Sequence, residues 1–462
     1  MTAPNHGRLQ SVLGLGFGLA GAVGGTIGAG ILRTPGLVAA EMGEPWLIWG
    51  AWIIGGLYAL LGAVAVAELA AALPKAGGWW IYAQRAFGGR AGLLTGWTDW
   101  LAHCIGLAWV ATTAGDYAAP LLPAQLNTGS AAIASKAMAL GVIGLFSLIQ
   151  LRGVKAGSAS QELLSLAKAA AFSALVLACF VLKPVPLAAE ATVLPEPLAV
   201  GAELSWPTLL LPLVVALQGV ITTYDGWASP AYFAEEFSEP ARDLPRSLIG
   251  GVLAVLLLYL LINAGLLRVL PLAVLAGSSL PAATAATALI GPAGGLVISA
   301  VALVALLGLI NTAIMSAPRI LYGLSTAELL PLPALSRVND GGTPAPALLL
   351  TTATAAALVL LGNFERLLAM GAVLYVSLPL IGMASLLALR LKEPALPRPF
   401  RCWGYPLTPL LIAAGSLAFV VGAVAADPLS SVAALALAAL AIPAASATPA
   451  PASGPPPDSR GT

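Results

Sequence analysis

Long apolar stretches dominate this chain, and short polar, glycine-rich or proline-rich segments separate them. A helix that crosses a membrane needs about 20 consecutive apolar residues. Stretches that reach or approach this length cover residues 11–40, 46–72, 91–117, 132–151, 158–182, 207–237, 247–270, 293–325, 345–362, 365–391, 406–426 and 429–445. The pattern therefore predicts an all-α integral membrane protein with about twelve transmembrane helices.

Composition supports a lipid environment and excludes other classes of protein. Hydrophobic residues make up 59% of the 462 residues and charged residues only 9%, whereas soluble domains carry about 25% charged residues. A soluble core cannot bury so much apolar surface, so the lipid bilayer is the expected surrounding. The net charge of +1 gives no argument for nucleic acid as a partner.

The charges between the apolar stretches predict an orientation. If residues 1–10 are cytoplasmic, the inner loops and helix ends hold Lys75, Arg85, Arg90, Arg152, Lys155, Arg242, Arg246, Arg319, Arg337, Arg390, Lys392, Arg398 and Arg401. The outer connections hold Lys183, Arg268 and Arg366. By the positive-inside rule, we expect a multi-pass protein of the cell membrane with both termini in the cytoplasm. The proline-rich residues 447–462 predict a disordered tail.

Two of the apolar stretches are too long for one straight helix and contain helix-breaking residues near their middle. Residues 21–30 read GAVGGTIGAG and residues 224–230 read YDGWASP, and glycine and proline both weaken helices. Each break opens a predicted five-helix unit. An odd number of spans inverts the second unit relative to the first, and paired broken helices mark the binding site of inverted-repeat transporters. The predicted parts are repeats over 11–183 and 207–391, an extracellular loop over 184–206, and a cytoplasmic loop with helices 11 and 12 over 392–446.

Four segments carry a resemblance to a known family. They are GTIGAGI (Gly25 to Ile31), AELAAALPKAGGWWIYAQRAFGG (Ala67 to Gly89), YDGWASPAYFAEEFSEPARDLPRS (Tyr224 to Ser247) and RPFRCWGYPLTPLL (Arg398 to Leu411). In this order they resemble the amino acid–polyamine–organocation (APC) superfamily of permeases, and most closely its L-type amino acid transporter branch. The resemblance implies a LeuT-type 5+5 inverted-repeat fold, alternating access and an amino acid as the cargo.

The first break suits the charged groups of an amino acid. Both groups need partners inside a bilayer, and the half-helix that begins near Gly28 offers free N–H groups to a carboxylate. The carbonyls of Gly24 to Thr26 suit the ammonium. The alternative is that these glycines only pack helices, as GxxxG spacings do. The candidate binding residues here are Thr26, Ile27, Gly28, Ala29 and Gly30.

The second break supplies the other candidate binding residues, Thr222, Thr223, Tyr224, Asp225, Gly226 and Trp227. The resemblance implies that backbone carbonyls here face the substrate amine. Many relatives carry a bulky aromatic lid where this chain has Thr222, so Tyr224 or Trp109 is considered in its place. A carboxylate at mid-depth is a functional candidate, and some relatives that accept cationic amino acids have an acid at the position of Asp225. The alternative is that Asp225 only caps the exposed backbone of the break.

Lys168 lies deep within a predicted helix, eleven positions after Gly157 and thus roughly 16 Å along the axis. In sodium-coupled members of the fold, an ion lies between helices one and eight. In several proton-coupled or exchanging relatives a helix-five lysine fills that space, and Lys168 matches it. Its ammonium is expected to pair with helix-one carbonyls and with Thr312 or Ser316. The alternative is that Lys168 extends toward the cytoplasmic interface.

Other ionisable residues give weaker hypotheses. His103 and Asp99 share a helix face, so they suit a proton relay, although a membrane histidine also serves helix packing. We expect Glu235, Glu236, Arg242 and Arg246 to stabilise a closed cytoplasmic gate.

These observations favour a sodium-independent amino acid transporter, either proton-coupled or exchanging. The alternatives are a transporter of polyamines or other organic amines and a non-transporting amino acid sensor. A membrane enzyme is disfavoured because His6 and His103 are the only histidines and no GxSxG motif occurs. We expect no cofactor and no metal; protons are candidate partners, and the sequence identifies no subunit partner.

Overall fold

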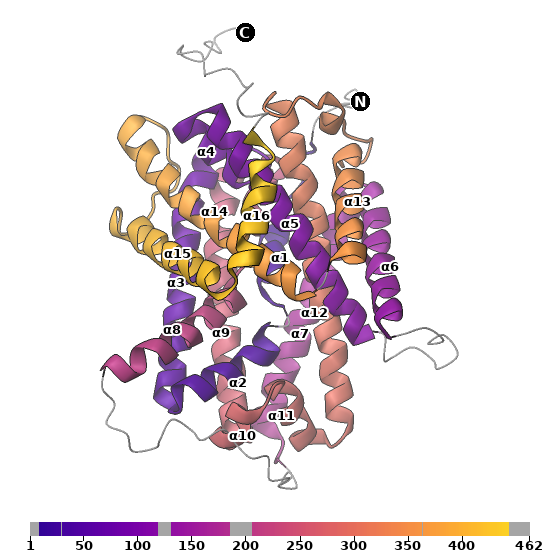
Figure 1. Ribbon diagram of the computed structural model, residues 1–462, viewed down its shortest axis with the longest axis vertical. Helices are drawn as coiled ribbons and strands as arrows, with labels where there is room; N and C mark the ends of the chain where they lie inside the picture. Colours follow the sequence, from indigo (N-terminus) through magenta and orange to yellow (C-terminus); the bar gives the residue numbers. More distant parts are fainter. Residues whose placement is uncertain (1–8, 29, 119–130, 185–205, 363, 443–462) are drawn as a thin grey trace.

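The computed structural model describes residues 9–28, 30–118, 131–184, 206–362 and 364–442. These parts form helices and connecting segments, with an isolated bridge between Leu13 and Phe237 (Figure 1). The helices of the first half are α1 (Leu15–Thr26), α2 (Gly30–Met42), α3 (Pro45–Ala72), α4 (Trp79–Phe87), α5 (Gly89–Ala118), α6 (Ala131–Leu151) and α7 (Val154–Val181).

The second half begins with the other broken helix. Its elements are α8 (Trp206–Tyr224), η3 (Ser229–Glu236), α9 (Pro240–Val269), α10 (Leu272–Gly277), α11 (Pro281–Ile290), α12 (Ala293–Thr326), η4 (Pro333–Ser336), α13 (Ala345–Leu361), α14 (Phe364–Lys392), α15 (Leu407–Ala426) and α16 (Pro428–Ala439). The all-α membrane fold expected from the sequence is confirmed.

Each of the twelve predicted stretches contains a helix or a helix pair. Within the described residues, eight helices are long and apolar enough to cross a membrane, and the bent pair α1 and α2 brings the number to nine. The 30-residue α5 is long enough but carries Asp99 and His103. Two shorter apolar helices, α13 and α16, have 17 and 12 residues. The predicted tail, most of the 184–206 loop and the last residues of the twelfth stretch lie outside the described residues.

Three short helices were not predicted. They are α4, α10 and α11, with 9, 6 and 10 residues. Each is too short to cross a bilayer, so a search for apolar stretches of spanning length treats them as loops. In addition, α9 begins at Pro240 rather than at residue 247, because a proline in the first turn and Asp243 near the helix start favour an earlier N-terminus.

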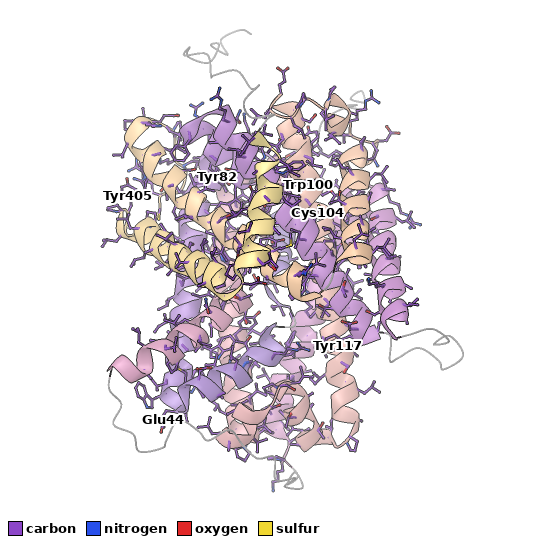
Figure 2. All side chains as sticks on the ribbon, viewed as in Figure 1. Glu44, Tyr82, Trp100, Cys104, Tyr117 and Tyr405 are labelled. Carbon is purple, nitrogen blue, oxygen red and sulfur yellow. The ribbon has the colours of Figure 1, made fainter. Side chains whose placement is uncertain are left out.

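The broken helices lie at the centre of the bundle. The α1 half packs against α7, α9 and α12, whereas the α2 half packs against α8. Figure 1 shows α4 toward one end of the molecule and α10 and α11 at the other. Figure 2 likewise places Tyr82 of α4 and Glu44, just before α3, toward opposite ends. The breaks therefore lie between the two ends, among helices that would cross the bilayer.

Candidate functional site

Both expected helix breaks are present. The axes of α1 and α2 differ by 48° across the interruption after Thr26. The helix α8 ends at Tyr224, residues 225–228 form turns, and the chain continues as the 3₁₀ helix η3. Pro230 stands in the first turn of η3, where its missing N–H costs little. The sequence predicted both interruptions because glycine, aspartate and proline all favour non-helical backbone at these positions.

The two breaks are in direct backbone contact. Gly226 has a φ of +99°, which side-chain-bearing residues rarely adopt. A Cβ atom at Gly226 would collide with the carbonyl oxygen of Gly25, and a Cβ atom at Gly25 would lie 2.9 Å from the carbonyl oxygen of Gly226. Glycine at both positions is therefore needed for the two chains to approach this closely.

Tyr259 of α9 joins the two breaks through its hydroxyl group. That hydroxyl lies 3.2 Å from the carbonyl oxygen of Thr26 and 3.1 Å from the carbonyl oxygen of Thr223. A second link connects the hydroxyls of Thr34 and Thr223, which are 2.7 Å apart. The sequence analysis missed Tyr259, because a single tyrosine in an apolar stretch is also typical of ordinary helix packing.

Lys168 of α7 is fully buried and hydrogen-bonds the first break. Its ammonium donates to the carbonyl oxygens of Gly24 at 2.7 Å and Ile27 at 3.0 Å. The side chain crosses Gly308 of α12, where a Cβ atom would lie 2.6 Å from the lysine nitrogen. The expected contact with helix-one carbonyls is confirmed, and Lys168 does not extend to the interface.

Among the described residues, Lys168 forms no hydrogen bond with Thr312 or Ser316, so this expected contact is wrong. The hydroxyl of Thr312 donates to the carbonyl oxygen of Gly308 at 2.9 Å, and that of Ser316 donates to the carbonyl oxygen of Thr312 at 2.8 Å. In an apolar surrounding, a serine or threonine hydroxyl can donate its hydrogen bond to the carbonyl oxygen one turn earlier in its own helix. Both residues remain buried on α12.

A buried polar chain continues from Lys168 along the same face of α7. Ser165 donates to the carbonyl oxygen of Ala20 at 2.8 Å, and the Gln161 amide oxygen accepts from Asn311 of α12 at 2.8 Å. The Asn311 side-chain oxygen in turn accepts from Gln150 of α6 at 2.8 Å. These bonds hold α1, α6, α7 and α12 together around the break.

The other candidates in the first break differ in their surroundings. Ile27 is buried, and a Cβ atom at Gly28 would lie 2.8 Å from the Leu309 side chain. At Gly30 it would lie 3.1 Å from the Thr223 hydroxyl. Ala29 lies outside the described residues. The carbonyls of Gly24 and Thr26, which the sequence analysis offered to a substrate ammonium, already accept bonds from Lys168 and Tyr259.

The candidates in the second break divide into an exposed set and a buried set. Thr222 and Asp225 are exposed although the break lies inside the bundle. Tyr224 and Trp227 are buried. Tyr224 stacks edgewise on Trp52 of α3 at 6.0 Å. The exposed side chains are the ones available to a ligand.

Trp227, two residues after the exposed Asp225, is packed against α3 and α4. Its ring packs on Gly62 of α3, where a Cβ atom would lie 2.8 Å away. Its ring centroid is also 6.4 Å from that of Trp79 in α4. Trp109 of α5 is half-buried. Packing therefore accounts for the position of Trp227.

His103 and Asp99 form a buried pair on α5. The His103 Nδ1 atom lies 3.1 Å from the Asp99 carboxylate, and the Tyr232 hydroxyl of η3 donates to the same carboxylate at 2.9 Å. The rings of His103 and Tyr375 are 5.5 Å apart. The pair therefore contacts the segment that follows the second break, a geometry that suits both a packing role and a proton relay.

The segment after the second break is closed by a buried ion pair. Arg319 of α12 binds both carboxylate oxygens of Glu236, and its guanidinium lies 4.7 Å from the Phe233 ring centre. The backbone of Leu13 donates to the carbonyl oxygen of Glu236 at 2.8 Å. Glu236 is therefore the residue, among those expected to form a gate, that takes part in this buried ion pair.

This arrangement defines a class: a multi-pass membrane protein of LeuT type, in which two broken helices meet and a buried lysine caps the first. The chain belongs to the amino acid permease family, whose pattern matches residues 9–444.

Curated relatives agree with this assignment. The chain is 28% identical to the serine/threonine exchanger SteT of Bacillus subtilis (strain 168), over 418 residues that cover 90% of this chain and 91% of that protein. It is 28% identical to the human b(0,+)-type amino acid transporter 1, over 86% of this chain and 80% of that protein. It is 27% identical to the mouse Asc-type amino acid transporter 1, over 82% and 70%. The protein is thus an amino acid permease, and its family consists of transporters.

Proposed function

We propose that this permease moves amino acids across the cell membrane by alternating access and without sodium, and that the two helix breaks form its binding site. The observation that carries the proposal is the position of the Lys168 ammonium. It lies 2.7 Å from the carbonyl oxygen of Gly24, so a fixed cation already satisfies the carbonyls at the first break. A second cation beside it would be repelled, and most strongly at low dielectric.

The ligand contacts follow from the free backbone groups at the breaks. The start of α2 at Gly30 presents helix-terminal N–H groups to the substrate carboxylate. The substrate ammonium binds carbonyls at the end of α8, near the exposed side chains of Thr222 and Asp225. Tyr259 positions both breaks relative to each other.

Alternating access follows from two inverted five-helix repeats, residues 11–183 and 207–391, with both termini in the cytoplasm. The Glu236–Arg319 pair closes the cytoplasmic side, while Thr222 and Asp225 remain exposed. A buried pair of this kind holds one state and must open in the other, which suits a gate. Transport is either obligatory exchange or proton-coupled, depending on whether Lys168 keeps its charge throughout the cycle.

A transporter of polyamines or other organic amines is the second candidate. The exposed Asp225 carboxylate at the break favours it, because such a cargo carries positive charge and needs no partner for a carboxylate. The N–H groups at the start of α2 favour the amino acid.

The experiment that separates the two candidates is a binding survey. Purified protein is titrated with free α-amino acids, with their decarboxylated amines and with diamines. Binding of α-amino acids and loss of binding on decarboxylation supports the proposal. Equal binding of each amino acid and its amine would contradict it, because the carboxylate site would then contribute nothing.

A further inference from the structure

A groove beside the start of α9 lies outside the transport site. It runs between the start of α9 and the segment that precedes α15, and its volume is about 440 Å³. Its lining combines two arginines with apolar side chains: Arg242, Arg246, Ile249, Leu253 and Phe400. Neither arginine takes part in the Glu236–Arg319 ion pair. The gate role expected for Arg242 and Arg246 therefore does not explain why they line this groove.

The groove has a polar end and an apolar end because of helix periodicity. Arg242, Arg246, Ile249 and Leu253 follow each other at intervals of three or four residues, so they share one face of α9. Leu257, one turn further, is 60% exposed and continues the apolar face. Charge at the helix start and apolar surface toward its middle match the two ends of a membrane lipid.

The opposite wall of the groove is held rigidly. Arg398 lies 3.1 Å from the Glu68 carboxylate of α3, and the N–H of Cys402 donates to the same carboxylate at 2.6 Å. Phe400 stands between these two anchors and packs against Trp403 at 5.8 Å between ring centres. Trp403 is 56% exposed, and exposed tryptophan is typical of the membrane–water interface.

The arginines are available to a ligand. Arg242 pairs with Glu239 at 2.9 Å, but the two side chains are 59% and 61% exposed. Such surface pairs contribute little and exchange readily for a better partner. Arg246 is exposed. Basic pockets at helix ends are suited to acidic lipid headgroups.

We propose that this groove binds an anionic glycerophospholipid, with the phosphate at Arg242 and Arg246 and an acyl chain along Leu253 and Leu257. The apolar half of the groove gives a lipid an advantage over a soluble phosphate, which cannot use it. The site is independent of the cargo and of the transport mechanism.

The test measures lipids retained by the full-length purified protein. Protein in detergent is incubated with phosphatidylglycerol or phosphatidylcholine of identical acyl chains, and bound lipid is counted by native mass spectrometry. Each arginine is expected to contribute about fivefold to the preference for the acidic lipid. The double variant Arg242→Gln/Arg246→Gln should lose this preference. The double variant Arg152→Gln/Arg337→Gln, which removes two other exposed arginines, should keep it.

Three results would overturn the proposal. The first is equal retention of the two lipids by the unmodified protein. The second is an unchanged preference for the acidic lipid in the double variant Arg242→Gln/Arg246→Gln, with gel filtration showing that this variant remains folded. If the double variant does not fold, the single variant Arg246→Gln is tested instead. The third is displacement of the lipid by inorganic phosphate, which would make the groove a soluble-anion site.

Discussion

The hydroxyl of Tyr259 lies 3.2 Å from the carbonyl oxygen of Thr26 and so ties the first helix break to α9. The same hydroxyl lies 3.1 Å from the carbonyl oxygen of Thr223 at the second break. This side chain therefore links the two halves of the proposed site, in addition to the Gly25–Gly226 backbone contact and the Thr34–Thr223 hydrogen bond. A shift of either break during transport must lengthen at least one of these contacts.

Tyr259→Phe is expected to lower amino acid uptake several-fold while the protein still folds. The change removes one hydroxyl, a loss of about 0.5–1.5 kcal/mol, but keeps the ring contact with Trp52 at 5.7 Å. The measurement is uptake into liposomes at matched protein content. The control is Tyr405→Phe, since that ring lies 4.5 Å from the Arg390 guanidinium in the segment before α15. If the two variants lowered uptake equally, the Tyr259 hydroxyl would have no specific role in the binding site.

Gly25→Ala and Gly226→Ala are each expected to abolish substrate binding. Either methyl group would push the two breaks apart, and Gly226 has in addition a φ of +99°, which costs about 1–2 kcal/mol for a residue with a Cβ atom. Gly21→Ala is the matched control, because a Cβ atom there meets nothing within 4 Å.

The comparison separates a binding role from simple helix packing, since Gly21 and Gly25 have the same GxxxG spacing. Binding is measured by titration of the purified variants. Normal affinity in Gly25→Ala, or a loss in Gly21→Ala as large as in Gly25→Ala, would mean that the contact between the breaks does not support the site.

The sequence alone predicted the spanning helices and the position of both breaks, because apolar length and helix-breaking residues are local properties. It missed α4, α10 and α11, which are too short to be recognised as spans. The resemblance to the permease family implied that Lys168 lies beside the first break, and its depth along one helix argued against a position at the interface. The sequence could not find Tyr259, nor that Thr312 and Ser316 satisfy their hydroxyls within α12, because these partners are set by packing between distant segments.

Asp225→Asn tests the charge preference of the site. If the exposed carboxylate faces the cargo, the variant should lose affinity for cationic amino acids by about tenfold or more, since a hydrogen bond to a charged group is worth about 1.5–3 kcal/mol. Neutral amino acids should lose much less. An equal loss for both would assign Asp225 to capping the exposed backbone of the break.

Reporter fusions test the proposed orientation. Fusions after Arg337, which follows η4, and at the C-terminus should both report the cytoplasm, because basic residues concentrate in the connections assigned to that side. A fusion after Gly277, at the end of α10, should report the outside and serves as the opposite control. An outside signal from either of the first two fusions would contradict the twelve-span arrangement.

The buried lysine also predicts how transport is driven. Lys168→Ala should reduce transport at least tenfold, because two charge-assisted hydrogen bonds to the first break are lost. If Lys168 releases its proton during the cycle, the variant should lose proton-driven uptake and partly retain exchange. If it stays charged, an imposed pH gradient should leave uptake unchanged in the unmodified protein.

The most direct test of the account is amino acid uptake by the purified protein in liposomes from which sodium is omitted. Because the Lys168 ammonium already binds the carbonyl oxygens of Gly24 and Ile27, uptake should proceed at the same rate with sodium or with an organic cation in its place. A strict requirement for sodium would contradict the proposed role of Lys168, and with it the sodium-independent mechanism.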